Sequence, residues 1–148
     1  MRDSVLVFID GTICDLSHRH ALKGTTNFEN ETEIMKDIAV NDAVLCMNEI
    51  FEKFDIIYIG ARSKSTVAIT RKWIQANGFP DGTVVIGSNQ KERMSIVKEL
   101  KKEIRFIAGI GDRWDDNELH LELGCLSIIL EEYNCNWNTV RKYLLNAD

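Results

Sequence analysis

The stretch "VLVFIDGT", residues 5–12, decides the fold. Apolar side chains fill its first five positions, and the acidic loop Asp10-Gly11-Thr12 follows at once. An apolar run of this length without alternation is typical of a strand that is buried on both faces, as in a parallel sheet. The stretch therefore predicts a buried strand over residues 4–9 whose carboxyl end carries a carboxylate.

Short apolar runs and helical patterns alternate along the rest of the chain. Asp42 is expected to cap the first helix, and Asn77-Gly78 and Gly124 are expected to end the second and the fourth. The alternation implies an α/β fold, in which one Rossmann-like domain spans residues 1–148 and helices cover both faces of a mostly parallel sheet of about five strands. Strands are predicted over residues 56–59, 83–86, 104–110 and 126–130, and helices over 42–54, 65–76, 90–102, 115–123 and 136–145.

Residues 13–40 break this alternation. They contain the polar tract "KGTTNFENETE" and one short helical pattern over residues 31–38. Because the segment directly follows the acidic loop, we interpret it as a small cap or lid over the strand ends. The alternative is a surface excursion without a role.

The composition favours an ordinary globular protein, with 45% hydrophobic and 28% charged residues among 148. A net charge of −5 and a pI of about 5.2 argue against a broad nucleic-acid surface, although they allow a local basic patch. We see no membrane-spanning run, no signal-peptide pattern and no metal-type cysteine spacing, so a cytoplasmic location without membrane contact is expected. The sequence leaves the oligomeric state open.

Polar residues follow each predicted strand, and the carboxyl ends of parallel strands share one edge of the sheet. Clustered carboxylates repel one another without a cation, and oxygen ligands with room for water and phosphate suit Mg²⁺. The sequence therefore predicts a Mg²⁺ site at this edge. The residues are Asp10, Gly11, Thr12 and Asp15 after the first strand; Gly60, Ala61, Arg62 and Ser63 after the second; Lys91 after the third; and Asp112, Arg113, Asp115 and Asp116 after the fourth.

Four of these segments, in this order, resemble the motifs of the haloacid dehalogenase-like superfamily, whose members are mostly phosphatases. "FIDGT" is similar to the first motif, D-x-D-G-T, except at its first letter, and "YIGARS" resembles the second. Lys91 suits the lysine of the third motif, and "IAGIGDRWDDNE" resembles the fourth, which ends in G-D-x-x-x-D. The resemblance extends over essentially the whole chain.

The resemblance implies a Mg²⁺-dependent phosphomonoester hydrolase that works through a phospho-aspartyl intermediate. Asp10 would protonate the leaving group and then activate water, and Lys91 would balance charge at the phosphoryl group. Asp112 and Asp116 would hold Mg²⁺ together with the Asp10 carbonyl, with Asp115 as the alternative to Asp116. The resemblance assigns phosphate binding to Gly11, Thr12, Gly60, Ala61, Arg62 and Ser63.

A narrower resemblance concerns "DGTICDLSHRH", residues 10–20. It is similar to lightly capped members that act on nucleotides or on the phosphate ends of nucleic acids. This implies a phosphorylated small molecule, a nucleotide or a nucleic-acid end as the partner. Asp15, His18 and Arg19 then become candidate cap residues for substrate specificity.

Two positions depart from the motifs, because Phe8 fills the place of the nucleophilic aspartate and Gly60 that of a Thr or Ser. A phenyl ring can neither attack phosphorus nor bind Mg²⁺. One hypothesis is therefore a degenerate protein that binds a phosphorylated ligand or a protein partner without turnover. The other is that one residue is missing from the sequence, since an Asp between Phe8 and Ile9 would give V-F-D-I-D-G-T.

Overall fold

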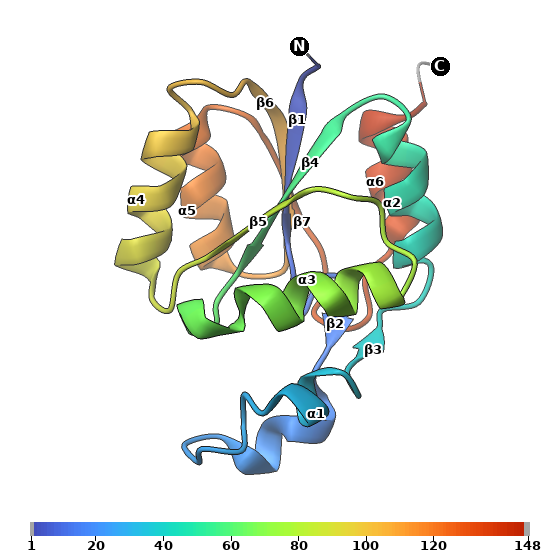
Figure 1. Cartoon of the computed structure of the whole chain (residues 1–148). Coiled ribbons are helices and arrows are strands. Elements are labelled where there is room, and N and C mark those ends of the chain that lie inside the picture. The colour runs from blue at the N-terminus through green and yellow to red at the C-terminus, as the bar shows by residue number, and fades with distance from the viewer. Residues whose placement is uncertain (1, 147–148) are drawn as a thin grey trace.

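A computed structural model describes residues 2–146 of the chain. Its core is a sheet of five strands in the order β5-β4-β1-β6-β7, and all four neighbouring pairs run parallel (Figure 1). The predicted α/β class is confirmed. The strands are β1 (Ser4–Phe8), β4 (Asp55–Gly60), β5 (Thr83–Ile86), β6 (Phe106–Gly111) and β7 (Leu126–Ile129).

Strand β1 lies at the centre of the sheet, between β4 and β6. Successive side chains of a strand point to opposite faces. Accordingly, Val5, Val7 and Ile9 enter one hydrophobic core, while Leu6 and Phe8 enter the other. Both faces are covered, which explains why the opening stretch is apolar without alternation.

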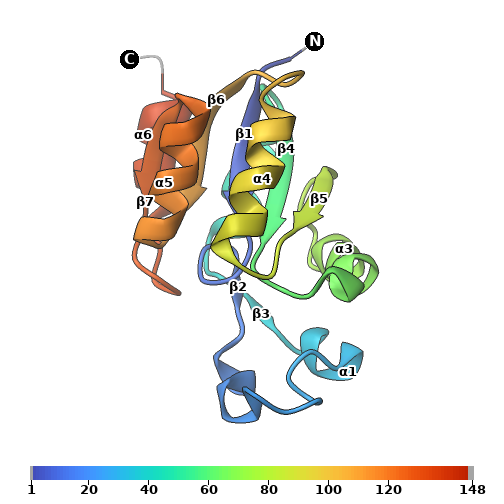
Figure 2. The same cartoon turned by 90° about the vertical axis from the view of Figure 1, so that its left-hand side faces the viewer.

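Five long helices cover the two faces of the sheet. Helices α2, α3 and α6 pack on one face around the buried indoles of Trp73 and Trp137, and α4 and α5 pack on the other around Val97 and Leu119 (Figures 1 and 2). Their bounds are α2 (Ala43–Phe51), α3 (Val67–Ala76), α4 (Gln90–Leu100), α5 (Trp114–Leu123) and α6 (Trp137–Leu144). Among residues 2–146, no helix has the length and apolar character needed to cross a membrane.

Most predicted helix ends are confirmed, and Asp42 lies at the N-cap position of α2 as predicted, although its side chain does not cap the helix. Gly78 and Gly124 follow α3 and α5 with φ angles of +83° and +67°, conformations that glycine adopts without a Cβ penalty. Asp42 makes no capping hydrogen bond and has a φ of 67°. Its carboxylate instead accepts bonds from the Arg141 guanidinium of α6 at 2.6 and 3.0 Å, which draws it away from the helix end.

The segment over residues 13–40 forms a small excursion beyond the carboxyl edge of the sheet (Figures 1 and 2). Its two ends pair as an antiparallel two-stranded sheet, and it holds two short helices between them. The helix predicted over 31–38 is shorter, because the chain must turn after it to enter the returning strand. The elements are β2 (Cys14–Asp15), the 3₁₀ helix η1 (Ser17–Leu22), α1 (Glu31–Ile34) and β3 (Ile38–Ala39).

Candidate functional site

A cavity of about 210 Å³ lies between the strand ends and the excursion. The sheet side contributes charged groups of both signs, and the excursion adds a second, mostly basic wall. This is the edge at which the sequence predicted a polar cluster. Among the lining residues are Asp10, Arg62, Arg93, Asp112 and Asp116 from the sheet side and Arg19 and Lys23 from the excursion.

Asp10 and Arg62 meet because they follow the neighbouring parallel strands β1 and β4. The Arg62 Nη2 donates to Asp10 Oδ1 at 2.7 Å, and its Nε lies 3.1 and 3.2 Å from the two carboxylate oxygens. A further bond, from Nη1 to the Thr70 hydroxyl at 2.9 Å, fixes the guanidinium against α3. Arg62 is 4% exposed while the Asp10 side chain keeps 18%, so the carboxylate is oriented yet open to the cavity.

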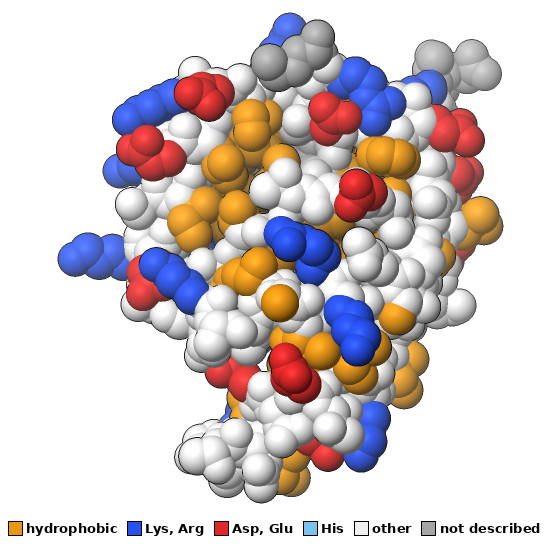
Figure 3. Space-filling model, in the orientation of Figure 1, with side chains coloured by type: hydrophobic (Ala, Val, Ile, Leu, Met, Phe, Trp, Pro, Cys, Tyr) orange, Lys and Arg blue, Asp and Glu red, His pale blue; other side chains and the backbone are white. Residues whose placement is uncertain are grey.

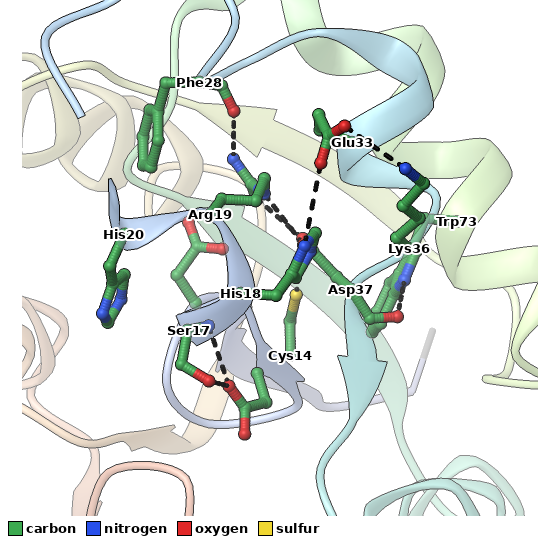
Figure 4. Close-up of polar contacts among 12 residues, drawn as sticks. Cys14, Ser17, His18, Arg19, His20, Phe28, Glu33, Lys36, Asp37 and Trp73 are labelled. Carbon is green, nitrogen blue, oxygen red and sulfur yellow. Dashed lines mark hydrogen bonds and ion pairs between the residues drawn. The ribbon is translucent and has the colours of Figure 1, made fainter. Parts of the chain in front are cut away.

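The excursion is tied to the core through Asp37, which sequence reasoning did not single out. Arg19 donates to its carboxylate from Nε and Nη2 at 2.8 and 2.7 Å (Figure 4). Arg62 Nη2 lies 3.5 Å from the same carboxylate. His18 Nε2 lies 2.6 Å from the same carboxylate. Burial opposes ionisation of Asp37, but the hydrogen bonds and charge of Arg19 outweigh it and hold the pKa below its usual value.

Asp112 lies across the cavity, at the end of β6. Its Oδ1 accepts a bond from the Thr12 hydroxyl at 3.0 Å, and its Oδ2 is buried without a hydrogen-bond partner among residues 2–146. Gly11, at φ +89°, makes room for it, because a Cβ there would lie 2.3 Å from Oδ2. Burial, followed by the negative charge of Asp116, raises the pKa of Asp112 to about 7.

Asp116 is buried beside Asp112, in the first turn of α5. Its Oδ2 accepts the backbone N–H groups of Asp112 and Arg113 at 2.9 and 3.1 Å, so it closes the end of this helix. Burial raises its pKa, although the two backbone hydrogen bonds act in the opposite direction. Asp115 is exposed on the cavity wall. Of the two neighbours, Asp116 is therefore the oriented carboxylate.

The acidic residues fit a Mg²⁺ ion of the usual open kind. Among residues 2–146, no three His, Cys, Asp or Glu side chains are arranged to enclose a metal by themselves. Mg²⁺ does not need such a cage, because it is commonly bound by one or two carboxylates, with water and phosphate oxygens as the other ligands. The unpartnered Oδ2 of Asp112, with Asp116 beside it, provides that arrangement.

Known proteins of this shape were found among solved structures. No protein-family model matches the chain, and no curated protein matches it. A class C acid phosphatase from Bacillus anthracis superposes with a TM-score of 0.70 at 16% identity, over 99% of this chain and 80% of that one. An enzyme of the HAD family from Bacteroides thetaiotaomicron, in complex with magnesium and inorganic phosphate, gives 0.61 at 11% identity, over 95% and 99%.

The chain has the haloacid dehalogenase-like fold. A chain from the Pnkp1/Rnl/Hen1 RNA repair complex also matches, with a TM-score of 0.71 at 12% identity over 89% of this chain. This chain covers 43% of the length of that one. The resemblance seen in the four motifs is thus confirmed at the level of the fold.

Phe8 occupies the position that precedes Ile9 in this haloacid dehalogenase-like fold. Its ring lines the cavity, is 4% exposed, and meets the His120 ring edge-on with centroids 5.7 Å apart. His120 is itself buried, with Nδ1 2.7 Å from the Ser127 hydroxyl, and burial lowers its pKa to about 4. The position that the motif resemblance assigns to the nucleophile therefore holds a buried, well-packed aromatic residue.

Helix α4 contributes one cationic side chain to the cavity wall, and it is Arg93 rather than the predicted Lys91. Lys91 is exposed and does not line the cavity. Arg93 lines it, is 9% exposed, and is held by a 2.8 Å bond from Nη1 to the Gly87 carbonyl. Helical spacing explains the difference, because Arg93 shares a face with the core residues Val97 and Leu100.

The remaining predicted residues divide between the cavity wall and structural roles. Gly11 and Ala61 line the cavity, whereas Gly60 is buried against Ile9. Ser63 donates its backbone N–H and hydroxyl to Glu29 at 2.9 and 2.6 Å, a second tie to the excursion. Asp15, the last residue of β2, accepts the corresponding two bonds from Ser17, the first residue of η1, at 2.9 and 2.6 Å.

Proposed function

We propose that the chain is a Mg²⁺-dependent phosphohydrolase that releases phosphate from a phosphomonoester. The observation that carries the proposal is the meeting of Asp10 and Asp112, from strands β1 and β6, in one cavity with the guanidinium groups of Arg62 and Arg93. Carboxylates that face arginines in a concave site suit a phosphoryl group and the cation that accompanies it.

The basic residues would bind and orient the phosphoryl oxygens. Arg62 and Arg93 are both buried and fixed by hydrogen bonds, so little freedom is lost when an anion arrives. Asp112 and Asp116, with the Asp10 carbonyl, would hold Mg²⁺. Bound there, the ion would neutralise charge on the phosphoryl oxygens. The excursion over residues 13–40 would act as the lid, with Arg19 in its inner wall.

Asp10 is the group proposed to move protons. With Phe8 in place, no aspartate is available to carry the phosphoryl group, so water attacks phosphorus directly. Its oxygen forms the new bond to phosphorus, and one of its protons passes to Asp10. The bond to the leaving oxygen breaks and leaves its electron pair on that oxygen, which then takes up the proton from Asp10. A chain with an aspartate before Ile9 would instead form the phospho-aspartyl intermediate, and Asp10 would protonate the leaving group.

A second candidate function is binding of a phosphorylated ligand without turnover. The observation that favours it is the burial of Phe8, the residue at the proposed nucleophile position, in the hydrophobic core. The loss of the catalytic nucleophile costs about 10⁶ in rate in a well-studied serine protease. Under this alternative the cavity keeps its affinity for phosphate and loses the chemistry.

We further propose a nucleotide or a nucleic-acid phosphate end as the substrate class. The likeness to a chain of an RNA repair complex supports it. On the face seen in Figure 3, basic and acidic side chains are intermixed, so this face offers no continuous basic track for a long nucleic-acid backbone.

The two functions are separated by measuring hydrolysis of p-nitrophenyl phosphate with Mg²⁺ for the wild type, Asp10→Asn, Phe8→Asp and Phe8→Asn. A phosphohydrolase turns over the substrate, and Asp10→Asn abolishes the rate. Phe8→Asp is expected to raise the rate by several orders of magnitude, because it supplies the nucleophile. Phe8→Asn matches it in size and polarity but cannot form the intermediate, so it should gain nothing.

Calorimetric titration with inorganic phosphate completes the test. Binding without wild-type turnover, combined with a gain of turnover in Phe8→Asp alone, would establish the second candidate. A wild-type rate that is unchanged in Asp10→Asn would refute the role of Asp10. If no variant binds phosphate or turns it over, both functions fail. The intact mass of the natural protein decides whether an additional aspartyl residue precedes Ile9.

A further inference from the structure

Trp114 is exposed to a degree that is unusual for an indole. Its exposed fraction is 82%, whereas those of Trp73 and Trp137 are 0% and 1%. An indole left in water forgoes the burial that its large apolar surface would otherwise gain. A side chain of this kind is suited to a ligand that brings its own apolar surface.

Trp114 lies next in the chain to residues that line the cavity, although it is not itself one of them. It is the first residue of α5, and this helix begins at the carboxyl edge of the sheet (Figure 2). Its two chain neighbours, Arg113 and Asp115, both line the cavity. A ligand that projects out of the cavity beside Arg113 and Asp115 would come next to the first turn of α5, which carries the exposed indole.

The cavity is too small to enclose a nucleotide. Its volume is about 210 Å³, whereas pockets that enclose drug-sized ligands measure roughly 300–1,000 Å³. A phosphoryl group and the sugar atoms next to it fill most of the available space. The rest of such a ligand must lie on the rim.

We propose that Trp114 stacks against the nucleobase of a ligand whose phosphoryl group occupies the cavity. The inference rests on the proposed function in one respect, namely that the cavity takes a phosphoryl group. Stacking on an aromatic side chain suits every base, because each presents a flat π face. The neighbouring Arg113 side chain, 61% exposed, adds a cation that an adjoining phosphate can meet.

The surroundings of Trp114 favour a small flat ligand over a protein partner. Charged residues precede and follow it in the chain, so it does not belong to a continuous apolar run. Leu121, two turns further along α5, is also exposed, but Glu118 lies between the two on that side of the helix. A protein interface requires a broader apolar centre.

The experiment compares three probes by calorimetric titration in the presence of Mg²⁺: adenosine 5′-monophosphate, ribose 5-phosphate and inorganic phosphate. The wild type is expected to bind the nucleotide about tenfold more tightly than ribose 5-phosphate, as a stacked base adds affinity. Trp114→Ala should abolish that difference and leave the affinity for inorganic phosphate unchanged. Trp114→Phe should retain part of it, and Leu121→Ala, an exposed apolar residue on the same side of α5, should retain all of it.

The outcomes separate this proposal from the proposed function. If inorganic phosphate binds but the base adds no affinity, or adds it equally in Trp114→Ala, stacking is refuted and the phosphate site stands. If inorganic phosphate itself does not bind, the proposed function fails and the stacking proposal fails with it. A change of oligomeric state in Trp114→Ala, with nucleotide binding intact, would assign the indole to self-association and overturn the proposal.

The same titration with a 3′-phosphorylated oligonucleotide identifies the source of the base. Tighter binding than that of the free nucleotide would assign the rim to nucleic-acid ends, since Arg113 can then meet a second phosphate. Equal or weaker binding would assign it to free nucleotides. Loss of the base contribution in Trp114→Ala is required in both cases.

Discussion

The two sides of the cavity hold their carboxylates in opposite ways. On the side of β1 and the excursion, Asp10 and Asp37 are each paired with arginines at 2.7 Å. On the side of β6 and α5, Asp112 and Asp116 lie beside each other. The guanidinium facing Asp112 belongs to Arg113, which is 61% exposed and 3.9 Å away. On the side of β1 the carboxylates are neutralised by arginines, whereas on the side of β6 they carry excess negative charge.

This difference indicates that the paired carboxylates have a structural role, whereas the unpaired ones have a functional role. Buried charges that are paired and hydrogen-bonded keep a unique arrangement, and the Asp37 cluster accordingly fastens the excursion to the sheet. Buried charges that are left unpaired raise the free energy of the empty site, as the raised pKa of Asp112 indicates. We infer that the acidic side is the one completed by a cation, and the arginine side the one that holds the cavity in shape.

The largest expected effect comes from breaking the paired side. Asp37→Ala leaves Arg19 and Arg62 buried without this partner, and removal of one member of a buried ion pair costs about 3–5 kcal/mol. The free energy of unfolding, measured by urea titration, should fall by this order.

The matched control is the exposed pair of Glu99 and Lys102, in which Glu99→Ala should change the free energy of unfolding by less than about 1 kcal/mol. Equal effects of Asp37→Ala and Glu99→Ala would show that the cluster does not fasten the excursion.

The second effect has the opposite sign and concerns the unpaired side. The pKa of Asp112 is raised from 3.8 to about 7, so the folded state favours the protonated carboxyl. This contribution to stability is complete below pH 3.8 and is lost as the pH rises through about 7. Asp112→Asn should therefore be more stable than the wild type at pH 8 without Mg²⁺, by about 1.4 kcal/mol for each pKa unit of the shift.

Thermal unfolding with and without Mg²⁺ checks this prediction. Millimolar Mg²⁺ should raise the Tm of the wild type at pH 8 and leave that of Asp112→Asn unchanged. If Mg²⁺ does not change the Tm of the wild type, the inference that a cation binds on the acidic side is refuted.

The smallest expected effect, on the affinity for phosphate, distinguishes the two basic side chains Lys91 and Arg93 of α4. Arg93→Gln removes a buried guanidinium from the cavity wall and should weaken phosphate binding about tenfold, or about 1.4 kcal/mol. Lys91→Gln, in the same helical turn but exposed, should change it by less than twofold. Calorimetric titration with inorganic phosphate measures both. The reverse order would return the charge-balancing role to Lys91.

The order of strands and helices could be predicted because each depends on local pattern. The uninterrupted apolar run before Asp10 indicated the central strand, and glycines after α3 and α5 marked where those helices end. Asp42 lies at the predicted N-cap position but makes no capping hydrogen bond, because Arg141, far along the chain, binds its carboxylate. That competition depends on tertiary packing, which no local pattern contains.

The acidic residues of the site could be predicted from the sequence, but the basic residues could be predicted less well. Asp10, Asp112 and Asp116 follow strands and so reach one edge of the sheet in any fold of this class. Arg93 could have been found from its helical spacing to Val97, a signal that favours it over Lys91. Asp37 offered no such signal, because its partners Arg19 and Arg62 approach it only after the excursion folds back.

The central place of β1 has a consequence for biosynthesis. This strand is synthesised before both of its neighbours in the sheet, because β4 and β6 begin only at Asp55 and Phe106. At about 5–20 residues per second, roughly 5–20 seconds pass before the second neighbour exists. During that interval one edge of a mostly apolar strand has no partner, so a nascent chain of this topology exposes a surface that favours aggregation until β6 has been translated.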